Sequence, residues 1–119
     1  MTPHELSLLH DMREAASDIL TRTQGCDKEG FVNNRDLQLI VERLFITLGE
    51  AAVRLEKQYP QTASRVPNLR GPIGFRNFLI HVYDQIDPAR VWDVVVSDLV
   101  TLSDAVSRLL TDAAGTEEA

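Results

Sequence analysis

The segment LQLIVERLFITLGEAAVRLEKQ, residues 37–58, decides the fold class, because its apolar side chains recur every three or four residues. This spacing predicts one long amphipathic helix with a buried stripe. The stripe consists of Leu37, Ile40, Val41, Leu44, Phe45, Leu48, Ala51, Ala52 and Leu55. Side chains able to cap its first turn precede it at Asn33, Asn34 and Asp36. Gly49 costs this helix about 1 kcal/mol relative to alanine, which is tolerable if a neighbouring helix approaches closely there.

Three further segments are expected to be helical, and none alternates like a strand. They cover about residues 4–23, 72–85 and 88–111, the last opened by Asp87 as a cap and Pro88 in the first helical position. Residues 60–74 hold three prolines and two glycines and are expected to form a structured connector. The sequence therefore predicts an all-α, antiparallel bundle of four to five helices. We expect one domain over residues 1–112 and a flexible acidic tail over residues 113–119.

Length and composition exclude several classes of protein. The chain has 119 residues, 44% of them hydrophobic and 25% charged, which is typical of one globular domain. No stretch approaches the roughly 18 to 20 uninterrupted apolar residues that a membrane span needs. The first 17 residues mix charges with apolar residues and lack the continuous apolar core of a secretory signal. We therefore expect a cytoplasmic protein with no membrane partner.

Cysteine and histidine are too sparse for a disulfide or a zinc cluster. The candidates are Cys26, His4, His10 and His81. The formal net charge of -6 argues against bulk attraction to nucleic acid. Residues 54–76 are nevertheless basic, with five cations and one carboxylate, so one part of the chain could meet a phosphate.

A second informative segment, FRNFLIHVYDQI at residues 75–86, places polar side chains along the expected third helix. At about 100° per residue, the core arc would hold Phe75, Phe78, Leu79, Val82 and Ile86. The opposite arc would hold Arg76, Asn77, Ile80, His81, Tyr83 and Asp84. On a continuous helix Arg76 would lie about 20° from Tyr83 but about 140° from His81. One helix therefore does not aim Arg76 and His81 at one atom, whereas a two-fold contact through Ile80 with a second copy would gather two such sets in a cleft.

These residues have an ordinary alternative explanation, since arginine, histidine and tyrosine are commonly exposed or half exposed on a helix. The weighting changes because residues 76–83 spell R-x-x-x-x-H-x-Y. This pattern resembles the signature of the HepT-like toxins, a branch of the HEPN ribonucleases. The resemblance covers about residues 5–110 and includes a G-E-A segment at Gly49, Glu50 and Ala51, Y-P at Tyr59-Pro60, I-D at Ile86-Asp87, and Trp92. A tryptophan often found in the family's connector is missing, with Leu69 near its place.

The resemblance implies a homodimeric HEPN-type bundle that acts as the RNA-cleaving toxin of a toxin–antitoxin pair. It implies Arg76 and His81 as catalytic residues, with no metal or other cofactor, and products with 2',3'-cyclic phosphate and 5'-hydroxyl ends. The residue types suit this chemistry, because an imidazole moves a proton at neutral pH and a guanidinium binds phosphate oxygens. As supporting residues we expect Asn77, to donate to phosphate or base, and Asp84, to orient the imidazole.

Tyr83 would be the residue to which the partner antitoxin, a minimal nucleotidyltransferase, attaches AMP in this family. Arg65 and Arg70 in the basic connector could guide RNA. Two other classes stay open: a HEPN-type module that binds a nucleotide or a nucleotidyltransferase without cutting RNA, and a purely structural helical dimer. Trp92 is expected to pack under the helix of residues 72–85.

Overall fold

The computed structural model describes residues 1–118, and every regular element in that range is helical. The elements are α1 Pro3–Thr23, α2 Lys28–Val32, α3 Arg35–Gln58, α4 Pro60–Ala63, α5 Arg70–His81, the 3-10 turn η1 Tyr83–Gln85, α6 Pro88–Ser97 and α7 Leu99–Glu118. The all-α prediction is confirmed. None of these helices combines the length and the apolar character that a membrane span requires.

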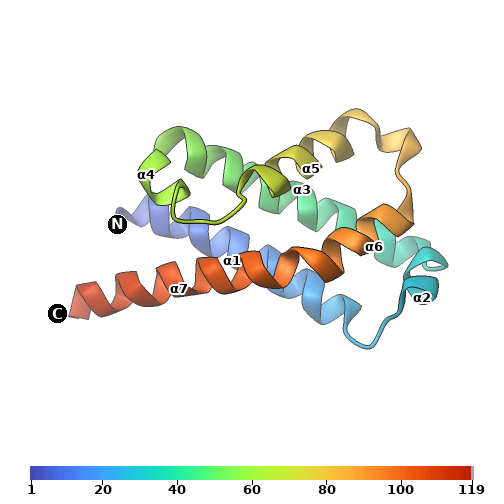
Figure 1. The fold of residues 1–119 in the computed structure, drawn as a ribbon, viewed down its shortest axis with the longest axis horizontal. Coiled ribbons are helices and arrows are strands. Elements are labelled where there is room, and N and C mark those ends of the chain that lie inside the picture. Colours follow the sequence, from blue (N-terminus) through green and yellow to red (C-terminus); the bar gives the residue numbers. More distant parts are fainter. Residues whose placement is uncertain (119) are drawn as a thin grey trace.

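The long helices lie side by side in the order α5, α3, α1, α7 (Figure 1). α3 packs along both α1 and α5, α7 packs along α1, and the shorter α6 packs against α2. α3 and α5 run antiparallel, since Glu56 near the end of α3 pairs with Arg70 at the start of α5 at 3.0 Å. α5 therefore lies on one flank of the molecule, supported mainly by α3.

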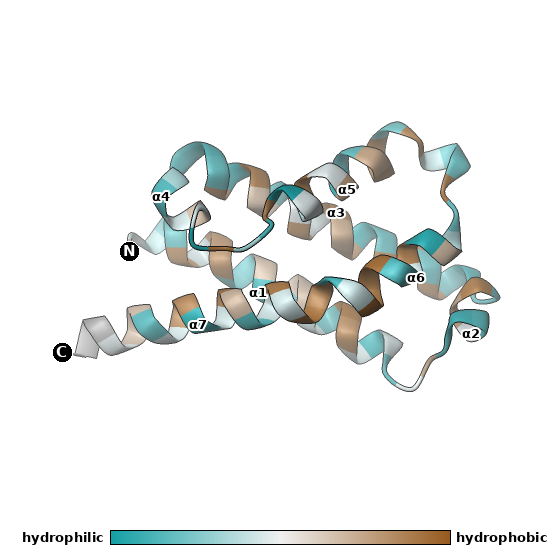
Figure 2. Cartoon of the chain, in the orientation of Figure 1, coloured by the Kyte–Doolittle hydropathy of each residue, from teal (hydrophilic) through white to brown (hydrophobic). Residues whose placement is uncertain are grey.

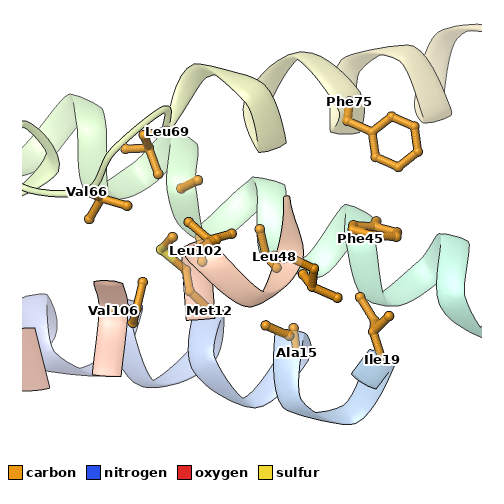
Figure 3. Packing of buried hydrophobic residues seen from close by; sticks show 14 of the residues in the cluster. Met12, Ala15, Ile19, Phe45, Leu48, Val66, Leu69, Phe75, Leu102 and Val106 are labelled. Atoms are coloured by element: carbon orange, nitrogen blue, oxygen red, sulfur yellow. The ribbon is translucent and has the colours of Figure 1, made fainter. Parts of the chain in front are cut away.

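The core forms where the apolar stripes of these helices meet (Figure 3). Met12 and Ile19 of α1 meet Phe45 and Leu48 of α3, and all four are nearly inaccessible to solvent. Figure 2 shows hydrophobic residues interrupted by hydrophilic ones along each long helix, as expected for amphipathic elements. One residue of the predicted stripe, Ile40, departs from it and is exposed.

Two helix boundaries follow the predicted caps. α3 begins after Asn34, whose Oδ1 accepts from the Leu37 N–H at 3.1 Å. α6 begins after Asp87, whose Oδ1 accepts from the Ala89 N–H at 3.0 Å. These side chains satisfy backbone donors that a helix start leaves free, which is why their positions were readable in the sequence.

Other boundaries differ from the prediction. The expected helix over 88–111 is broken at Asp98. The hydroxyl of the preceding residue, Ser97, donates to the carbonyl of Asp93 at 2.6 Å, and a hydrogen bond of this kind bends helices. α7 then continues to Glu118, past the expected end near Thr111 and into the segment expected to be a flexible tail; residue 119 lies outside the described residues.

The third predicted helix is shifted toward the N-terminus. α5 starts at Arg70 rather than Pro72, because Pro72 falls in its first turn, where a missing N–H costs no hydrogen bond. It ends at His81 rather than Gln85, and the chain tightens into η1. Trp92, which is expected to pack under this helix, has its aromatic contact with Phe31 of α2, with ring centroids 5.5 Å apart.

Candidate active site on helix α5

Arg76 lies in the middle of α5, directly over Gly49 of α3. A Cβ atom at Gly49 would come within 2.2 Å of the Arg76 Cβ and 3.0 Å of the Pro72 carbonyl oxygen. Such distances are far inside van der Waals contact, so only glycine allows the two backbones to approach this closely. The expectation that a neighbouring helix explains Gly49 is confirmed, and the close approach fixes where the Arg76 side chain starts.

The guanidinium of Arg76 is held on two sides. Its Nη1 donates to the Oδ1 of Asn77 at 2.8 Å, and its Nη2 lies 4.0 Å from the Oε1 of Glu50. The side chain is 25% exposed, and its Nε is buried without a hydrogen-bond partner among the described residues. An unsatisfied buried N–H costs about 1–3 kcal/mol. The site thus presents a partly buried, positioned cation at the α3–α5 junction.

His81 is the last residue of α5 and is exposed to solvent. Asn77, one turn earlier, is also exposed, and its side chain accepts the hydrogen bond from Arg76. Asp84 lies beyond the helix end in η1, and the described residues include no hydrogen bond between it and His81. The structure therefore brings Arg76 and Asn77 together but does not join Asp84 to the imidazole.

Tyr83 is 77% exposed in η1. The predicted 20° angle between Tyr83 and Arg76 assumed a helix continuing to Gln85, and it is wrong because α5 ends two residues before Tyr83. The phenol of Tyr83 is therefore accessible to solvent two residues after His81 and does not stack on Arg76 as the expected helix would have it.

Arg65 and Arg70 are exposed, and each forms an ion pair with a carboxylate. Arg70 pairs with Glu56 at 3.0 Å, and Arg65 lies 3.8 Å from Asp112 at the far end of α7. Exposed pairs of this kind are worth about 0.2–1 kcal/mol, so a phosphate could replace either carboxylate at little cost.

Exposed apolar side chains flank the Arg76 face. Ile80 follows Arg76 by one helical turn and is 37% exposed, and Leu39 and Ile40 near the start of α3 are also exposed. Because α3 and α5 are antiparallel and Arg76 lies over Gly49, the end of α5 lies beside the middle of α3, and Leu39 and Ile40 lie further toward the start of α3. Ile80 is therefore the exposed apolar side chain next to the motif, as a covered face would have.

Two features near the site were not identified from the sequence. Glu42 of α3 is only 12% exposed, and burial raises its pKa although the guanidinium of Arg35, 3.9 Å away, acts in the opposite direction. The guanidinium of Arg90 on α6 lies 4.1 Å from the centre of the Phe78 ring of α5. Neither feature has a local signal, because the pKa of Glu42 depends on its burial in the folded bundle and the Arg90–Phe78 contact joins two different helices. Within residues 1–118 no group of three or more His, Cys, Asp or Glu side chains is placed to hold a metal ion.

Comparisons with known proteins identify the family. Residues 12–109 match the family model described as "Ribonuclease HepT-like". Three similar proteins have names beginning "Putative RNase": MJ1380 and MJ1216 of Methanocaldococcus jannaschii and TTE0752 of Caldanaerobacter subterraneus. MJ1380 is 31% identical over 78% of this chain and 84% of its own length. The corresponding figures for MJ1216 are 26%, 94% and 92%, and for TTE0752 27%, 77% and 81%.

No solved structure matches the chain. The family model spans most of the chain, including the whole of α5 and the motif residues on it. These relationships support a ribonuclease activity, and the chain belongs to the HepT-like ribonuclease family.

Proposed function

We propose that this protein is a metal-independent endoribonuclease and the toxin of a toxin–antitoxin pair. The observation that carries the proposal is the Arg76 guanidinium, held at the α3–α5 junction by Glu50 and Asn77, on the helix that ends with an exposed His81. This supplies a positioned cation and a proton-transfer group on one element. Family membership supports RNA as the substrate.

The chemistry follows from what the substrate brings. The ribose 2'-hydroxyl attacks the adjacent phosphorus, the bond to the 5'-oxygen breaks, and the products carry 2',3'-cyclic phosphate and 5'-hydroxyl ends. His81 accepts or returns a proton in this step, and Arg76 stabilises the extra charge on the phosphate. Asn77 would donate to a phosphate or a base. The nucleophile belongs to the RNA, so the proposed mechanism requires no metal and no activated serine.

Asp84 is proposed to orient the imidazole of His81. The two side chains share no hydrogen bond in this structure, so the role requires a different rotamer or a shift of η1 when substrate binds. Asp84→Asn with unchanged turnover would remove this part of the proposal.

A homodimer is proposed to complete the site. Arg76 and His81 lie five residues apart on α5, about 140° around the helix, so one copy does not direct both at the same phosphate. Ile80 and the exposed Leu39 and Ile40 could be covered by a second copy, which would place two Arg76–His81 sets around one cleft. Sedimentation of the wild type and of Ile80→Asp tests this, and the variant should be monomeric.

Tyr83 is proposed as the site at which a cognate minimal nucleotidyltransferase attaches AMP. Its 77% exposure supports access by a second enzyme. A phosphate on this residue, two positions after His81, would add charge and bulk beside the motif and exclude RNA. Incubation with the nucleotidyltransferase and ATP should label the wild type but leave Tyr83→Phe unlabelled.

Arg65 and Arg70 are proposed to guide the RNA backbone by exchanging their carboxylate partners for phosphates. Arg70→Ala should weaken RNA binding, and it should reduce the slope of the logarithm of the binding constant against the logarithm of salt concentration by about one. Equal salt dependence in both proteins would exclude Arg70 from the RNA path.

The test of the activity is cleavage of mixed cellular RNA by the wild type and by His81→Ala, with product ends mapped. We expect cutting that persists in EDTA and is lost in the variant. The alternative is a non-catalytic HEPN module that binds a nucleotide or the nucleotidyltransferase, which the exposed Tyr83 would also suit. That module would show no cleavage in either protein while still interacting with the nucleotidyltransferase.

A further inference from the structure

A pocket of about 500 Å³ lies between α5 and the α6–α7 pair, on the flank where α5 has no closely packed helix. Its apolar wall includes Phe45 and Leu48 of α3, Phe75 of α5 and Leu102 of α7. This volume lies within the range typical of small-molecule sites. Figure 3 shows Phe45 and Phe75 toward one end of the main core, with Leu48 and Leu102 nearer its middle.

The rim of the pocket carries charged side chains of both signs and uncharged polar groups. Arg90 lies at one end, with its guanidinium over the Phe78 ring, and Asp98 follows it on the same wall about 12 Å further along. Asn68 and Thr101 add an amide and a hydroxyl. Among residues 1–118 neither Arg90 nor Asp98 is in an ion pair, so both can engage a ligand.

The pocket lies on the side of α5 that carries His81, and Arg76 points away from it on the other side of the helix. Gly74 lines the pocket, and His81 follows it by seven residues, which is two helical turns and about 20°. The distance along the helix axis is about 10 Å, the length of about three stacked nucleotides. A strand whose phosphate sits at His81 could therefore place a nearby base in the pocket.

The pocket's chemistry distinguishes between classes of occupant. An aliphatic ligand would use the apolar wall but none of the rim groups, and a lipophilic anion would meet Arg90 but be repelled by Asp98. An unpaired base has an aromatic face and a mixed donor and acceptor edge, which proteins recognise with aromatic rings, guanidinium planes and polar side chains. We propose that this pocket binds an unpaired base of the RNA close to the cleaved bond and thereby sets where the strand is cut. The proposal rests on RNA being the substrate.

The pocket can be filled without disturbing the core, because a Cβ at Gly74 meets no atom within 4 Å. Gly74→Leu should project a side chain into the space, and Thr101→Trp should fill it from the opposite wall. Gly115→Leu is a matched control, since Gly115 is another helical glycine whose Cβ would meet nothing, on α7 away from the pocket. Thermal melts establish that each variant is folded.

Binding is measured with probes that cannot be cleaved: hexadeoxynucleotides of A, C or T, and an abasic hexamer with the same phosphates. At least one base-bearing hexamer should shift the Gly71 and Gly74 amide resonances and bind about tenfold more tightly than the abasic one. Gly74→Leu and Thr101→Trp should lose this difference, and Gly115→Leu should keep it.

Equal binding of the abasic hexamer, or base-dependent binding that survives in both filled variants, would overturn the assignment. These measurements need no turnover, so a protein that fails to cut RNA can still pass them. If the wild type cuts RNA and Gly74→Leu cuts at the same positions with the same preference, the pocket proposal fails while the ribonuclease proposal stands.

Discussion

Replacing Gly49 by alanine should displace α5, although glycine-to-alanine changes in exposed helices normally stabilise a protein. The added Cβ would lie 2.2 Å from the Arg76 Cβ and 2.7 Å from its Cγ. The first of these atoms is fixed to the α5 backbone, so no side-chain rotation relieves the clash. Ordinary contact requires more than 1 Å of extra separation, which must come from movement of the helix.

The energetic balance can be worked from this geometry. Alanine contributes up to about 1 kcal/mol of helix propensity, whereas forcing an extra carbon into a packed contact costs typically about 1–3 kcal/mol. The Pro72 carbonyl at 3.0 Å adds a second backbone obstacle, so we expect a net loss of about 1–2 kcal/mol. The matched control is Gly74→Ala, where the Cβ meets open space and a gain of about 0.5–1 kcal/mol is expected.

Urea unfolding of the wild type and both variants gives these free energies directly. RNA cleavage should fall with Gly49→Ala by about 100-fold, because a displacement of about 1 Å in a catalytic group can cost that much. Stabilisation by Gly49→Ala equal to that by Gly74→Ala, with unchanged cleavage, would refute the role given to this close approach.

Further predictions concern carboxylates. Glu50→Gln should lower the cleavage rate about tenfold, because it frees the Arg76 guanidinium. It should change the unfolding free energy by less than about 1 kcal/mol, because the Arg76–Glu50 pair is partly exposed. Equal cleavage rates in the wild type and the variant would exclude Glu50 as the residue that holds Arg76. The hydrogen bond from Thr62 lowers the pKa of Glu5. The Glu5 carboxylate therefore stabilises the fold at pH values above the ordinary carboxyl pKa of about 4.3, and this stabilisation is lost as pH falls. Urea midpoints measured from about pH 3 to 7 should show this loss in the wild type and much less of it in Glu5→Gln. Burial raises the pKa of Glu42, so its ionisation costs stability as pH rises above about 4.3, and Glu42→Gln should be more stable than the wild type at pH 7 but not at about pH 3.

Most of the helical framework could be predicted because it depends on local signals. The periodicity of residues 37–58 and the caps at Asn34 and Asp87 are properties of short segments, and α1, α3 and the start of α6 follow them. The glycine at position 49, a helix-destabilising residue within a strongly periodic apolar pattern, also predicts the close approach of a neighbouring helix.

The remaining differences arise from contacts between distant segments. α2 was missed because five residues give too short a pattern, although Asp27 caps it and Phe31 anchors it in the core. The periodicity of residues 88–111 continues through the break at Asp98, because α6 packs on α2 while α7 packs on α1.

The motif residues were readable from their spacing, but their surroundings were not. Arg76 and His81 lie on α5, within the expected helix, but the expected angle of Tyr83 is wrong because the helix ends at His81, where no proline or glycine marks the end. The ion pair of Arg76 with Glu50 and the pocket beside Phe75 depend on how α5 lies on α3.

The central claim, attack by the 2'-hydroxyl of the substrate, is tested most directly with a short RNA containing one mapped cleavage position. The ribose immediately 5' to the scissile phosphate is replaced by its 2'-deoxy counterpart, and cleavage is measured in EDTA. We predict that the all-ribose strand yields 2',3'-cyclic phosphate and 5'-hydroxyl ends and that the substituted strand stays intact at this position. Cleavage of the substituted strand there at the unmodified rate would contradict the mechanism.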